Sequence, residues 1–361
     1  MSFTLKHLAS LVQVAIQHRA SDIHIRSNEM PVLRIKGDLV PVQTKDFSVE
    51  DVADIMAILT VNPQFKNELN HHNELDGAFT IPELCRVRFN FFKYSDHYGI
   101  ILRIINDKIP TLKELAMAPI LGQIALQNRG LILITGATGS GKSTTLAAMI
   151  NHINENKAAH ILTIEDPIEY VHKQQRSRIT QREIGIDTDS YTVALRSALR
   201  QDPDVILIGE MRDPETVSIA LKAAETGHVV FSTMHTTNVL TTIGRIISMF
   251  PATEQIEIRK RMAENLHAVV GQRMLPGKNT NIVIAQEIMV TNPGVKEAIQ
   301  GKEDISRIQS IMANGFQKGG NGGQTFDQHI MRLYQEKIIT KETALEAVSS
   351  QADFIQKLIV E

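Results

Sequence analysis

The sequence predicts an α/β protein in which a parallel sheet with helices on both faces follows a smaller α+β domain and precedes a C-terminal helical segment. In the middle of the chain, apolar runs of strand length ("LILIT", "HILTIE", "VILIG" and "VVFSTMH") alternate with helical segments at 142–154, 190–201 and 213–226. This alternation is typical of a parallel sheet covered on both faces. Before residue 106, strand-like segments instead follow one another directly, as in an antiparallel sheet.

The first domain is expected to cover residues 1–105 and to combine helices with an antiparallel sheet. Apolar residues recur with helical spacing over 4–19, which predicts an amphipathic helix. Ser48 with Asp51 three residues later has the pattern of a capping box at the start of a second helix. The strands are predicted at "SDIHIRS", "VLRIKGDLVPV", "DGAFTI", "CRVRFNFFKYS" and "YGIILRII".

A linker is predicted at residues 106–115, where Pro110 breaks regular structure. The parallel-sheet domain is then expected to cover 116–293, with further strands at "VVGQRMLP" and "NIVIAQEIMV". Residues 294–361 are predicted to be mostly helical and to be interrupted by a flexible glycine-rich loop at 318–325.

Composition excludes several classes of function. The net charge of -2 over 361 residues creates no general attraction for nucleic acid. The basic runs at 173–182 and 259–261 are interpreted as solvated faces. The single cysteine, Cys85, allows neither a disulfide framework nor a cysteine-based zinc site and suits a reducing cytoplasm. No uncharged apolar run reaches the length of a bilayer, so any role at a membrane is expected to be peripheral.

Residues Gly136 to Ser143 fit the pattern G-x-x-x-x-G-K-[ST], with a predicted strand before them and a helix after them. Glycines in such a loop let main-chain N–H groups approach phosphate oxygens at the start of the helix. Lys142 is expected to reach the β- and γ-phosphates, and Ser143 to offer its hydroxyl to Mg²⁺. The alternative is a chance match on a glycine-rich turn, which this strand–loop–helix context disfavours.

Carboxylates and a histidine follow neighbouring predicted strands. "VILIGEMRD" ends in Gly209-Glu210, without the aspartate that commonly stands at this point, so Glu210 is the candidate for activating water. The acidic run that starts at Glu165 follows another strand, and His235 follows "VVFSTM". Ligands bind at the carboxyl ends of parallel strands, which favours a phosphate-sensing role for His235. A surface carboxylate, a turn or a structural histidine is the alternative in each case, and His228 is the weaker histidine candidate.

An arginine face is predicted in the first domain, where "CRVRFNFFKYSDHYGIILRII" indicates a hairpin. Strand alternation places Arg86, Arg88 and Asn90 on one face. If the turn is at residues 96–97, Arg103 pairs with Asn90 on that same face. Guanidinium groups gathered in this way suit an anion, and each could act as an arginine finger toward a nucleotide. A solvated sheet face is the alternative.

Several motifs together resemble a known family. "ASDIHI", "ITGATGSGKSTTLAAMI", "TIEDPIEY", "ALRQDPDVILIGEMRDPETV", "AAETGHVVFSTMHTTN" and "QTFDQHIMRLY" resemble the type IV pilus retraction ATPases, the PilT-like branch of the type II/IV secretion ATPase superfamily. The likeness covers nearly the whole chain and keeps the motif order. "GEMRD" and "TGHVVFSTMHT" are far more specific than the phosphate loop alone.

The resemblance implies a homo-hexameric ATPase that works in the cytoplasm, peripherally at the inner membrane. Each subunit would have an N-terminal PAS-like domain and a RecA-like P-loop domain, with ATP and Mg²⁺ bound between them. The ring would act on a polytopic inner-membrane platform protein and remove pilin subunits, which drives pilus retraction and twitching motility.

The same resemblance implies roles for individual residues. It implies an acidic-box role for Glu165, a catalytic glutamate at Glu210, histidine-box roles for His228 and His235, and phosphate-reaching arginines at Arg88 and Arg103. The implied nucleotide-binding residues are Gly136, Ala137, Thr138, Gly139, Ser140, Gly141, Lys142, Ser143 and Thr144.

Two comparisons with the family pattern narrow the expectation. Extension and secretion ATPases typically carry a tetracysteine zinc site, which a single cysteine excludes. Retraction motors usually carry the segment "AIRNLIRE", whereas residues 294–301 read "GVKEAIQG" and keep only its apolar spacing. The alternative to a retraction motor is therefore an accessory, low-turnover ring partner of a paralogous pilus ATPase.

Two further functions are disfavoured. A nucleic-acid translocase could share the RecA-like core, but the near-neutral charge and the lack of interleaved aromatic and basic residues count against it. Nothing in the sequence suggests the acceptor pocket of a small-molecule kinase.

Overall fold

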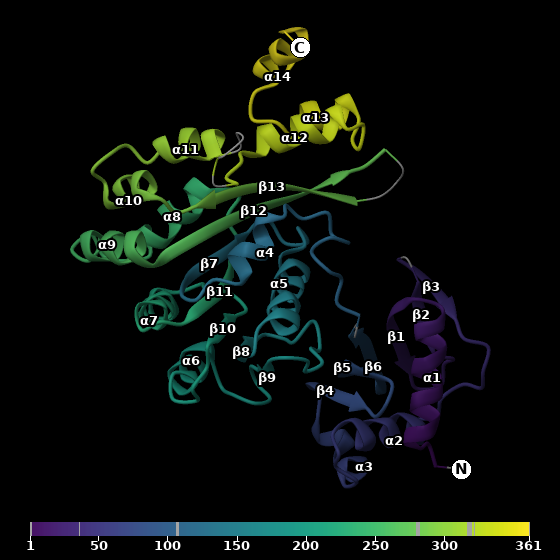
Figure 1. The fold of residues 1–361 in the computed structure, drawn as a ribbon. Coiled ribbons are helices and arrows are strands. Elements are labelled where there is room, and N and C mark those ends of the chain that lie inside the picture. Colours follow the sequence, from purple (N-terminus) through teal and green to yellow (C-terminus); the bar gives the residue numbers. More distant parts are fainter. Residues whose placement is uncertain are drawn as a thin grey trace. The chain divides into compact units, whose positions relative to one another are not determined.

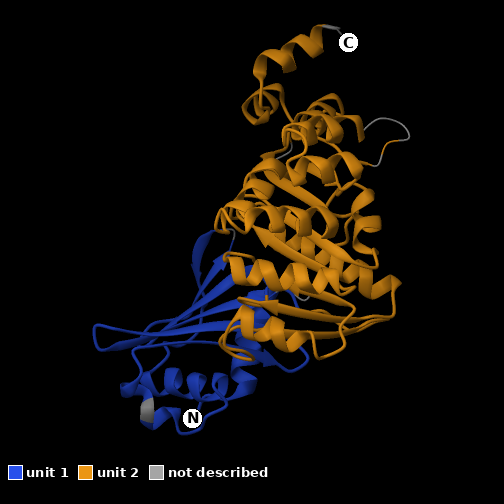
Figure 2. Ribbon diagram, turned by 90° about the vertical axis from the view of Figure 1, so that its left-hand side faces the viewer, with its two compact units in different colours: residues 1–108, 169–171 blue, residues 109–168, 172–361 orange. Residues whose placement is uncertain are grey.

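The structure is a computed structural model that describes residues 2–35, 37–105, 108–278, 282–315, 320 and 322–360. The chain forms two compact units (Figure 2). Unit 1 comprises residues 1–108 and 169–171, and unit 2 comprises residues 109–168 and 172–361. The main boundary between the units lies inside the predicted linker, of which residues 106–107 lie outside the described residues.

Unit 1 contains a six-stranded antiparallel sheet in the order β3-β2-β1-β6-β5-β4 (Figure 1). Alternation along β5 buries Val87, Phe89 and Phe91 in the core and turns Arg86 and Arg88 to the other face. The strands are β1 (Ala20–Arg26), β2 (Val32–Ile35), β3 (Asp38–Pro41), β4 (Glu74–Ile81), β5 (Cys85–Tyr94) and β6 (His97–Ile105).

Helices cover the apolar face of this sheet. They are α1 (Leu5–Gln17), α2 (Val49–Leu59), the short α3 (Phe65–Glu68) and a 3₁₀ turn (Leu69–His71). The predicted capping box is confirmed, because the Asp51 N–H donates to Ser48 Oγ (3.1 Å) and the Ser48 N–H donates to Asp51 Oδ2 (3.0 Å). The predicted N-terminal helix is also confirmed, although it ends at Gln17.

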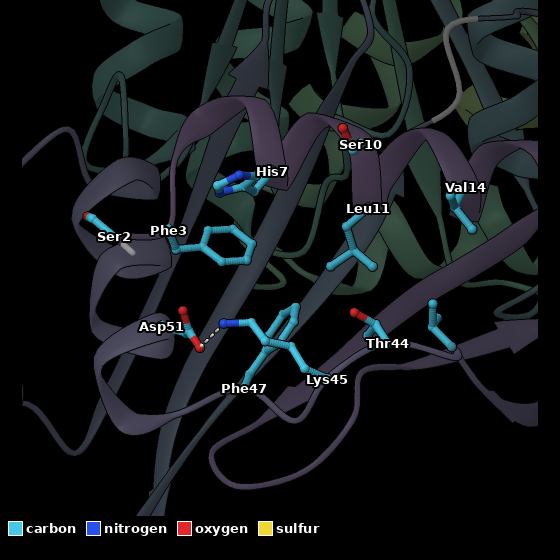
Figure 3. Close-up of a pocket in the computed structure, with 11 residues that line it drawn as sticks. Ser2, Phe3, His7, Ser10, Leu11, Val14, Thr44, Lys45, Phe47 and Asp51 are labelled. Atoms are coloured by element: carbon cyan, nitrogen blue, oxygen red, sulfur yellow. Dashed lines mark hydrogen bonds and ion pairs between the residues drawn. The ribbon is translucent and has the colours of Figure 1, made fainter.

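A pocket of about 400 Å³ lies between α1 and the segment that joins β3 to α2 (Figure 3). Successive turns of α1 line this pocket with the side chains of His7, Leu11 and Val14. Lys45 Nζ lies 3.3 Å from Asp51 Oδ2 at this pocket. None of the candidate site residues chosen from the sequence lines it.

Unit 2 contains a seven-stranded sheet in the order β13-β12-β7-β11-β10-β8-β9. Every neighbouring pair is parallel except β12 and β13, which are antiparallel. The strands are β7 (Gly130–Thr135), β8 (His160–Glu165), β9 (Arg178–Glu183), β10 (Val205–Ile208), β11 (Val229–Met234), β12 (Leu266–Pro276) and β13 (Ile282–Val290). The parallel strands end at one edge of the sheet, which is where the candidate site lies.

Helices pack on both faces of this sheet, as the sequence predicts (Figure 1). Successive residues of β7 serve the two faces: Leu131 and Leu133 belong to the core beneath α6 to α11, and Ile132 and Ile134 to the core beneath α4 and α5. The helices are α4 (Ile120–Ala125), α5 (Lys142–Asn156), α6 (Tyr191–Ala198), α7 (Pro214–Glu225), α8 (Val239–Ser248), α9 (Gln255–Asn265), α10 (Pro293–Gln300) and α11 (Arg307–Gly315).

The C-terminal segment packs on the hairpin of β12 and β13. Phe326 and Ile330 of α12 (Phe326–Gln335) share a small core with Ala285, and α13 (Lys341–Ala347) and α14 (Gln351–Val360) complete the segment. Residues 318, 319 and 321 of the predicted glycine-rich loop lie outside the described residues. The end of that loop pairs with β13, where Gln324 and Ile288 exchange main-chain hydrogen bonds of 2.8 and 3.0 Å.

The basic runs are not only solvated faces, which corrects the interpretation from sequence. Run 173–182 contains most of β9, an edge strand rich in charged and polar residues. In run 259–261, Arg259 Nη1 donates to the carbonyl of Ile299 at the end of α10 (3.0 Å). Arg261 forms a two-pronged pair with Glu225 of α7, with distances of 2.6 and 3.2 Å. These two arginines therefore connect helices to one another and do not form only a solvated surface.

Candidate active site

The loop between β7 and α5 wraps around the start of the helix. Gly136, Gly139 and Gly141 all have positive φ angles, of 151°, 79° and 86°. Gly141 is the N-cap of α5 and supplies no side-chain capping bond. The first N–H groups of α5 therefore stay available to an anion, where the helix dipole adds positive potential.

Lys142, the first residue of α5, has its ammonium group turned into this loop. The residue is 8% exposed, and Nζ donates to the carbonyl oxygens of Gly136 (2.9 Å) and Ala137 (3.0 Å). Ser140 Oγ is buried and has no hydrogen-bond partner among the described residues. An unpaired buried hydroxyl is costly unless an acceptor arrives, and a buried ammonium bonds more strongly to an anion than to neutral carbonyls. Phosphate oxygens would satisfy the hydroxyl and supply that anion.

His235 connects Glu210 to this loop, because its ring contacts both. The Glu210 side chain is 11% exposed, with Oε1 2.6 Å from Arg212 Nη2 and Oε2 3.4 Å from His235 Nε2. The other ring nitrogen of His235 lies 3.5 Å from Thr138 Oγ1 in the loop. The imidazole thus stands between the carboxylate that follows β10 and the loop that follows β7. The parallel order β7-β11-β10 brings these three strand ends together.

Glu165 ends β8, the strand next to β10, and lies at the same edge of the sheet. Its Oε1 accepts hydrogen bonds from Thr163 Oγ1 (2.7 Å) and Gln181 Nε2 (3.2 Å). Thr163 and Gln181 hold the carboxylate, while the main chain next to Glu165 meets β10, where the Gly209 N–H donates to the carbonyl of Ile164 (2.8 Å). Glu165 and Glu210 therefore stand at the ends of adjacent strands, at the sheet edge that also carries the phosphate loop.

Ser143 suits a magnesium ion through the chemistry of its side chain. It is the second residue of α5 and offers a half-buried hydroxyl at the start of the helix. Mg²⁺ in nucleotide sites usually keeps several waters and takes one or two protein oxygens together with phosphate oxygens. Ser143 can supply such an oxygen.

The structure does not bring His228 to this group within one chain. His228 immediately precedes β11, whereas His235 immediately follows it, so the strand separates the two rings. His228 Nδ1 lies 2.9 Å from the carbonyl of Ala223 and 3.1 Å from Thr226 Oγ1. These contacts lie at the C-terminal end of α7. A nucleotide-binding role for His228 stays a prediction.

The arginine face exists, but its register differs from the prediction. Arg103 pairs with Arg88, and Asn90 pairs with Ile101. The turn occupies Ser95 and Asp96, both with positive φ (41° and 63°), as a two-residue turn between twisted strands requires. The shift is two residues, so Arg103 keeps the predicted face and lies directly opposite Arg88.

Asp22 balances this pair of like charges. It lies opposite Arg103 on β1, and Arg103 Nε donates to Asp22 Oδ1 (2.8 Å). Burial acts to raise the pKa of Asp22, but the hydrogen bonds from Arg103 and Ser21 and the charge of Arg103 hold that pKa below its usual value. Asp22 is therefore an anion that orients Arg103, and Arg88 has no such carboxylate opposite it on β4, where its partner is Ala78.

Comparison with known proteins places the chain. Residues 2–348 match the family of type II/IV secretion system proteins. A twitching motility protein of Neisseria gonorrhoeae is 43% identical over 315 residues, which cover 87% of this chain and 83% of that protein. The chain belongs to the type II/IV secretion system family.

Two other relatives define the branch. The type IV pilus ATPase PilU of Pseudomonas aeruginosa is 38% identical and aligns over 95% of this chain and 89% of its own length. The crystal structure of the pilus retraction motor PilT with bound ADP matches with a TM-score of 0.86 and 36% identity, over 96% of this chain and 98% of that one. The chain is therefore a PilT-like secretion-family ATPase of the type IV pilus group, as the motifs predicted.

Two properties bear on its place in this family. In the part of the chain that the structure describes, no helix is both long and apolar enough to cross a bilayer. The segment that replaces the retraction motif forms α10, where Val295, Ala298 and Ile299 are fully buried. Its apolar spacing therefore serves packing against the core of unit 2.

Sequence reasoning gave no role to three residues that contact the site. Arg212 pairs with Glu210, Gln181 with Glu165, and Tyr191 approaches Gly209. Arg212 could have been found, because it stands two residues after Glu210 in "GEMRD". Gln181 comes from the unpredicted β9 and Tyr191 from the start of a helix, and no local pattern marks either.

The loop geometry predicts different outcomes for two glycine substitutions. A Cβ on Gly136 would lie 2.5 Å from both the carbonyl oxygen of Gln272 and Ser140 Oγ, so Gly136→Ala is expected to distort the loop and abolish nucleotide binding. A Cβ on Gly139 meets nothing within 4 Å, so Gly139→Ala costs only the strain of positive φ, about 1–2 kcal/mol. Titration with a fluorescent ADP analogue and thermal unfolding measure the two effects, and equal binding by both variants would contradict this geometry.

Proposed function

We propose that this chain is the subunit of a hexameric ATP-hydrolysing motor that powers type IV pilus retraction and twitching motility. The observation that supports hydrolysis best is the arrangement of Glu210, His235 and Thr138. A well-held carboxylate lies one imidazole ring away from a phosphate-binding loop. A protein that only binds nucleotide would not need a carboxylate in that place.

The loop supplies the binding step. The N–H groups from Gly136 to Thr144 surround the phosphates, and Lys142 exchanges its two carbonyl partners for phosphate oxygens. Mg²⁺ bound with ATP would neutralise charge on the phosphates, and Ser143 would hold it through its hydroxyl. The similar PilT structure contains bound ADP, which supports nucleotide binding by this chain.

Glu210 is the proposed general base. Its contacts with Arg212 and His235 hold both oxygens, so the carboxylate can accept a proton from a water aimed at the terminal phosphate. His235 touches both Glu210 and the loop, and it would report the presence of that phosphate to the base. Glu165 contributes a second negative charge from β8, held by Thr163 and Gln181.

Arg88 and Arg103 are proposed to bring positive charge to the nucleotide phosphates in the assembled ring. Asp22 already orients Arg103, and Arg88 is half-buried on the same face. Unit 1 would be the PAS-like domain and unit 2 the RecA-like domain of the family. Assembly into a hexamer would then complete the site.

The load is proposed to be a polytopic inner-membrane platform protein at the pilus base, with the ring peripheral to that membrane in the cytoplasm. The alternative is an accessory ring partner of a paralogous pilus ATPase. The identities of 36% to PilT and 38% to PilU are too close to decide between them. The altered sequence of α10 favours the accessory role, whereas the arrangement around Glu210 favours an active motor.

Glu210→Gln is expected to keep nucleotide affinity and lower turnover by about 10²- to 10⁴-fold, because the amide keeps the shape but cannot accept the proton. ATP hydrolysis and binding of a fluorescent ADP analogue measure the two properties. Glu264→Gln, which changes an exposed glutamate of α9, is the matched control and should match the unaltered protein. Unchanged turnover in Glu210→Gln would remove this residue from the catalytic role.

Arg88→Ala and Arg103→Ala are each expected to lower turnover by about 10³-fold or more if they act as arginine fingers. Arg103→Ala should also lower the melting temperature more than Arg88→Ala, because it leaves the Asp22 carboxylate without its guanidinium partner. Arg129→Ala, at an exposed arginine before β7, controls for loss of charge alone. If both face variants turn over ATP normally, the arginine face is only a solvated surface.

A further inference from the structure

A glycine stands where a carboxylate is commonly found at the end of this kind of strand. Gly209 follows β10 directly and precedes Glu210. A Cβ added to Gly209 would lie 2.7 Å from the Tyr191 hydroxyl oxygen, whereas its next contacts would be ordinary ones, 3.4 Å to the carbonyl of Ile164 and 3.5 Å to Glu165 Cα. The phenol oxygen therefore occupies the space that a side chain at position 209 would take.

Local structure aims Tyr191 at this space. Tyr191 is the first residue of α6, and Ser190 caps the helix by accepting a hydrogen bond from the Val193 N–H (3.3 Å). The Tyr191 ring packs against the main core of unit 2, which fixes the direction of the ring. This orientation of the ring brings the hydroxyl to the edge of the sheet at which β8 and β10 end.

The hydroxyl lies among negative charges. Burial raises the pKa of Tyr191, and the neighbouring carboxylates Glu210, Asp166 and Glu165 raise it further, while Arg212 opposes them. The phenol therefore keeps its proton throughout the working range of the protein. Within the part of the chain that the structure describes, the Tyr191 hydroxyl makes no hydrogen bond, so it holds an unused donor beside three acceptors.

Glu210 is the candidate acceptor for this donor, because its charge raises the pKa of Tyr191 more than the charges of Asp166 and Glu165 do. It directly follows Gly209, over which the hydroxyl lies. Glu165 Oε1 already accepts from Thr163 and Gln181, whereas Arg212 and His235 each contact a different oxygen of Glu210. Each Glu210 oxygen can still accept a further hydrogen bond.

We propose that Tyr191 is a positioning residue for hydrolysis, whose hydroxyl fills the space left by Gly209 and donates to the Glu210 carboxylate when nucleotide is bound. This inference rests on the proposed role of Glu210 as general base. The hydrogen bond holds the carboxylate in one orientation toward the attacking water. The ring alone would explain a phenylalanine at this position, and the hydroxyl is what requires a further reason.

Tyr191→Phe tests the hydroxyl alone, because it keeps the ring in the core. We expect kcat for ATP to fall about tenfold, with KM and the affinity for a fluorescent ADP analogue unchanged. A loss confined to kcat is what removal of a donor to the base predicts, because a structural defect would also change nucleotide affinity or the melting temperature. Arg212 and His235, which contact the Glu210 carboxylate, stay constant in this comparison.

Tyr334→Phe is the matched control, since Tyr334 is a half-buried tyrosine on α12 that contacts the ring of Phe354. It should leave kcat, KM and nucleotide affinity unchanged. A Tyr191→Phe variant with the same kcat as the unaltered protein would overturn the inference. A Tyr191→Phe variant with lower kcat together with weaker nucleotide affinity or a lower melting temperature would also overturn it, because a structural effect on folding or assembly would then suffice.

Gly209→Ala supplies an independent test of the same contact. Its methyl group would displace the Tyr191 hydroxyl, so we expect a fall in kcat similar to that of Tyr191→Phe. In the double variant the phenylalanine lacks the clashing oxygen, so the two losses should not add. Additive losses would contradict a shared mechanism.

Failure of this inference can be told apart from failure of the proposed function. If the unaltered protein hydrolyses ATP and Glu210→Gln does not, but Tyr191→Phe behaves as the unaltered protein, only the role of Tyr191 is wrong. If Glu210→Gln keeps full turnover, Glu210 is not the base and the role of Tyr191 falls with it. If the unaltered protein has no turnover, neither role exists.

Discussion

The parallel pairing of β7, β11, β10 and β8 is the constraint on which the candidate site depends. Because these neighbouring strands run in one direction, the phosphate loop, His235, Glu210 and Glu165 all emerge at one edge of the sheet. The strands are buried on both faces, so the position of each side chain at the edge is set by the packing of the core. Residues as far apart as Thr138 and His235, 97 positions, become neighbours without any direct local signal.

Charge is placed in the two units by different means. In unit 2, carboxylates gather at the strand ends, and Arg212, Gln181 and Thr163 compensate them by direct contacts. In unit 1, two arginines face each other across β5 and β6, and Asp22 on β1 compensates one of them. In the proposed ring, the phosphates of a nucleotide would meet the arginines of unit 1, and the bound Mg²⁺ would meet the carboxylates of unit 2.

The sequence predicted the elements that carry strong local patterns. The loop before α5 follows from glycine spacing, the start of α2 from its capping box, and the two-faced sheet from apolar runs. It did not predict β9, because an edge strand with charged residues lacks the apolar alternation of a buried one. The hairpin register was wrong by two residues because "YSDHYG" allows a turn at either dipeptide, and only backbone twist selects Ser95-Asp96. The sequence did not indicate Tyr191 as a site residue, because its side chain reaches the site from a helix and not from the end of a strand.

The most direct test of the central claim is Mg²⁺-dependent ATP hydrolysis per subunit, measured as the concentration of the protein is raised. A motor whose site is completed by neighbouring subunits should show turnover that rises steeply with concentration and reaches a plateau. The oligomeric state, measured on the same samples, should change over the same range. Turnover that is independent of concentration would contradict completion of the site by assembly. Absence of turnover at every concentration would contradict the motor itself and favour the accessory ring.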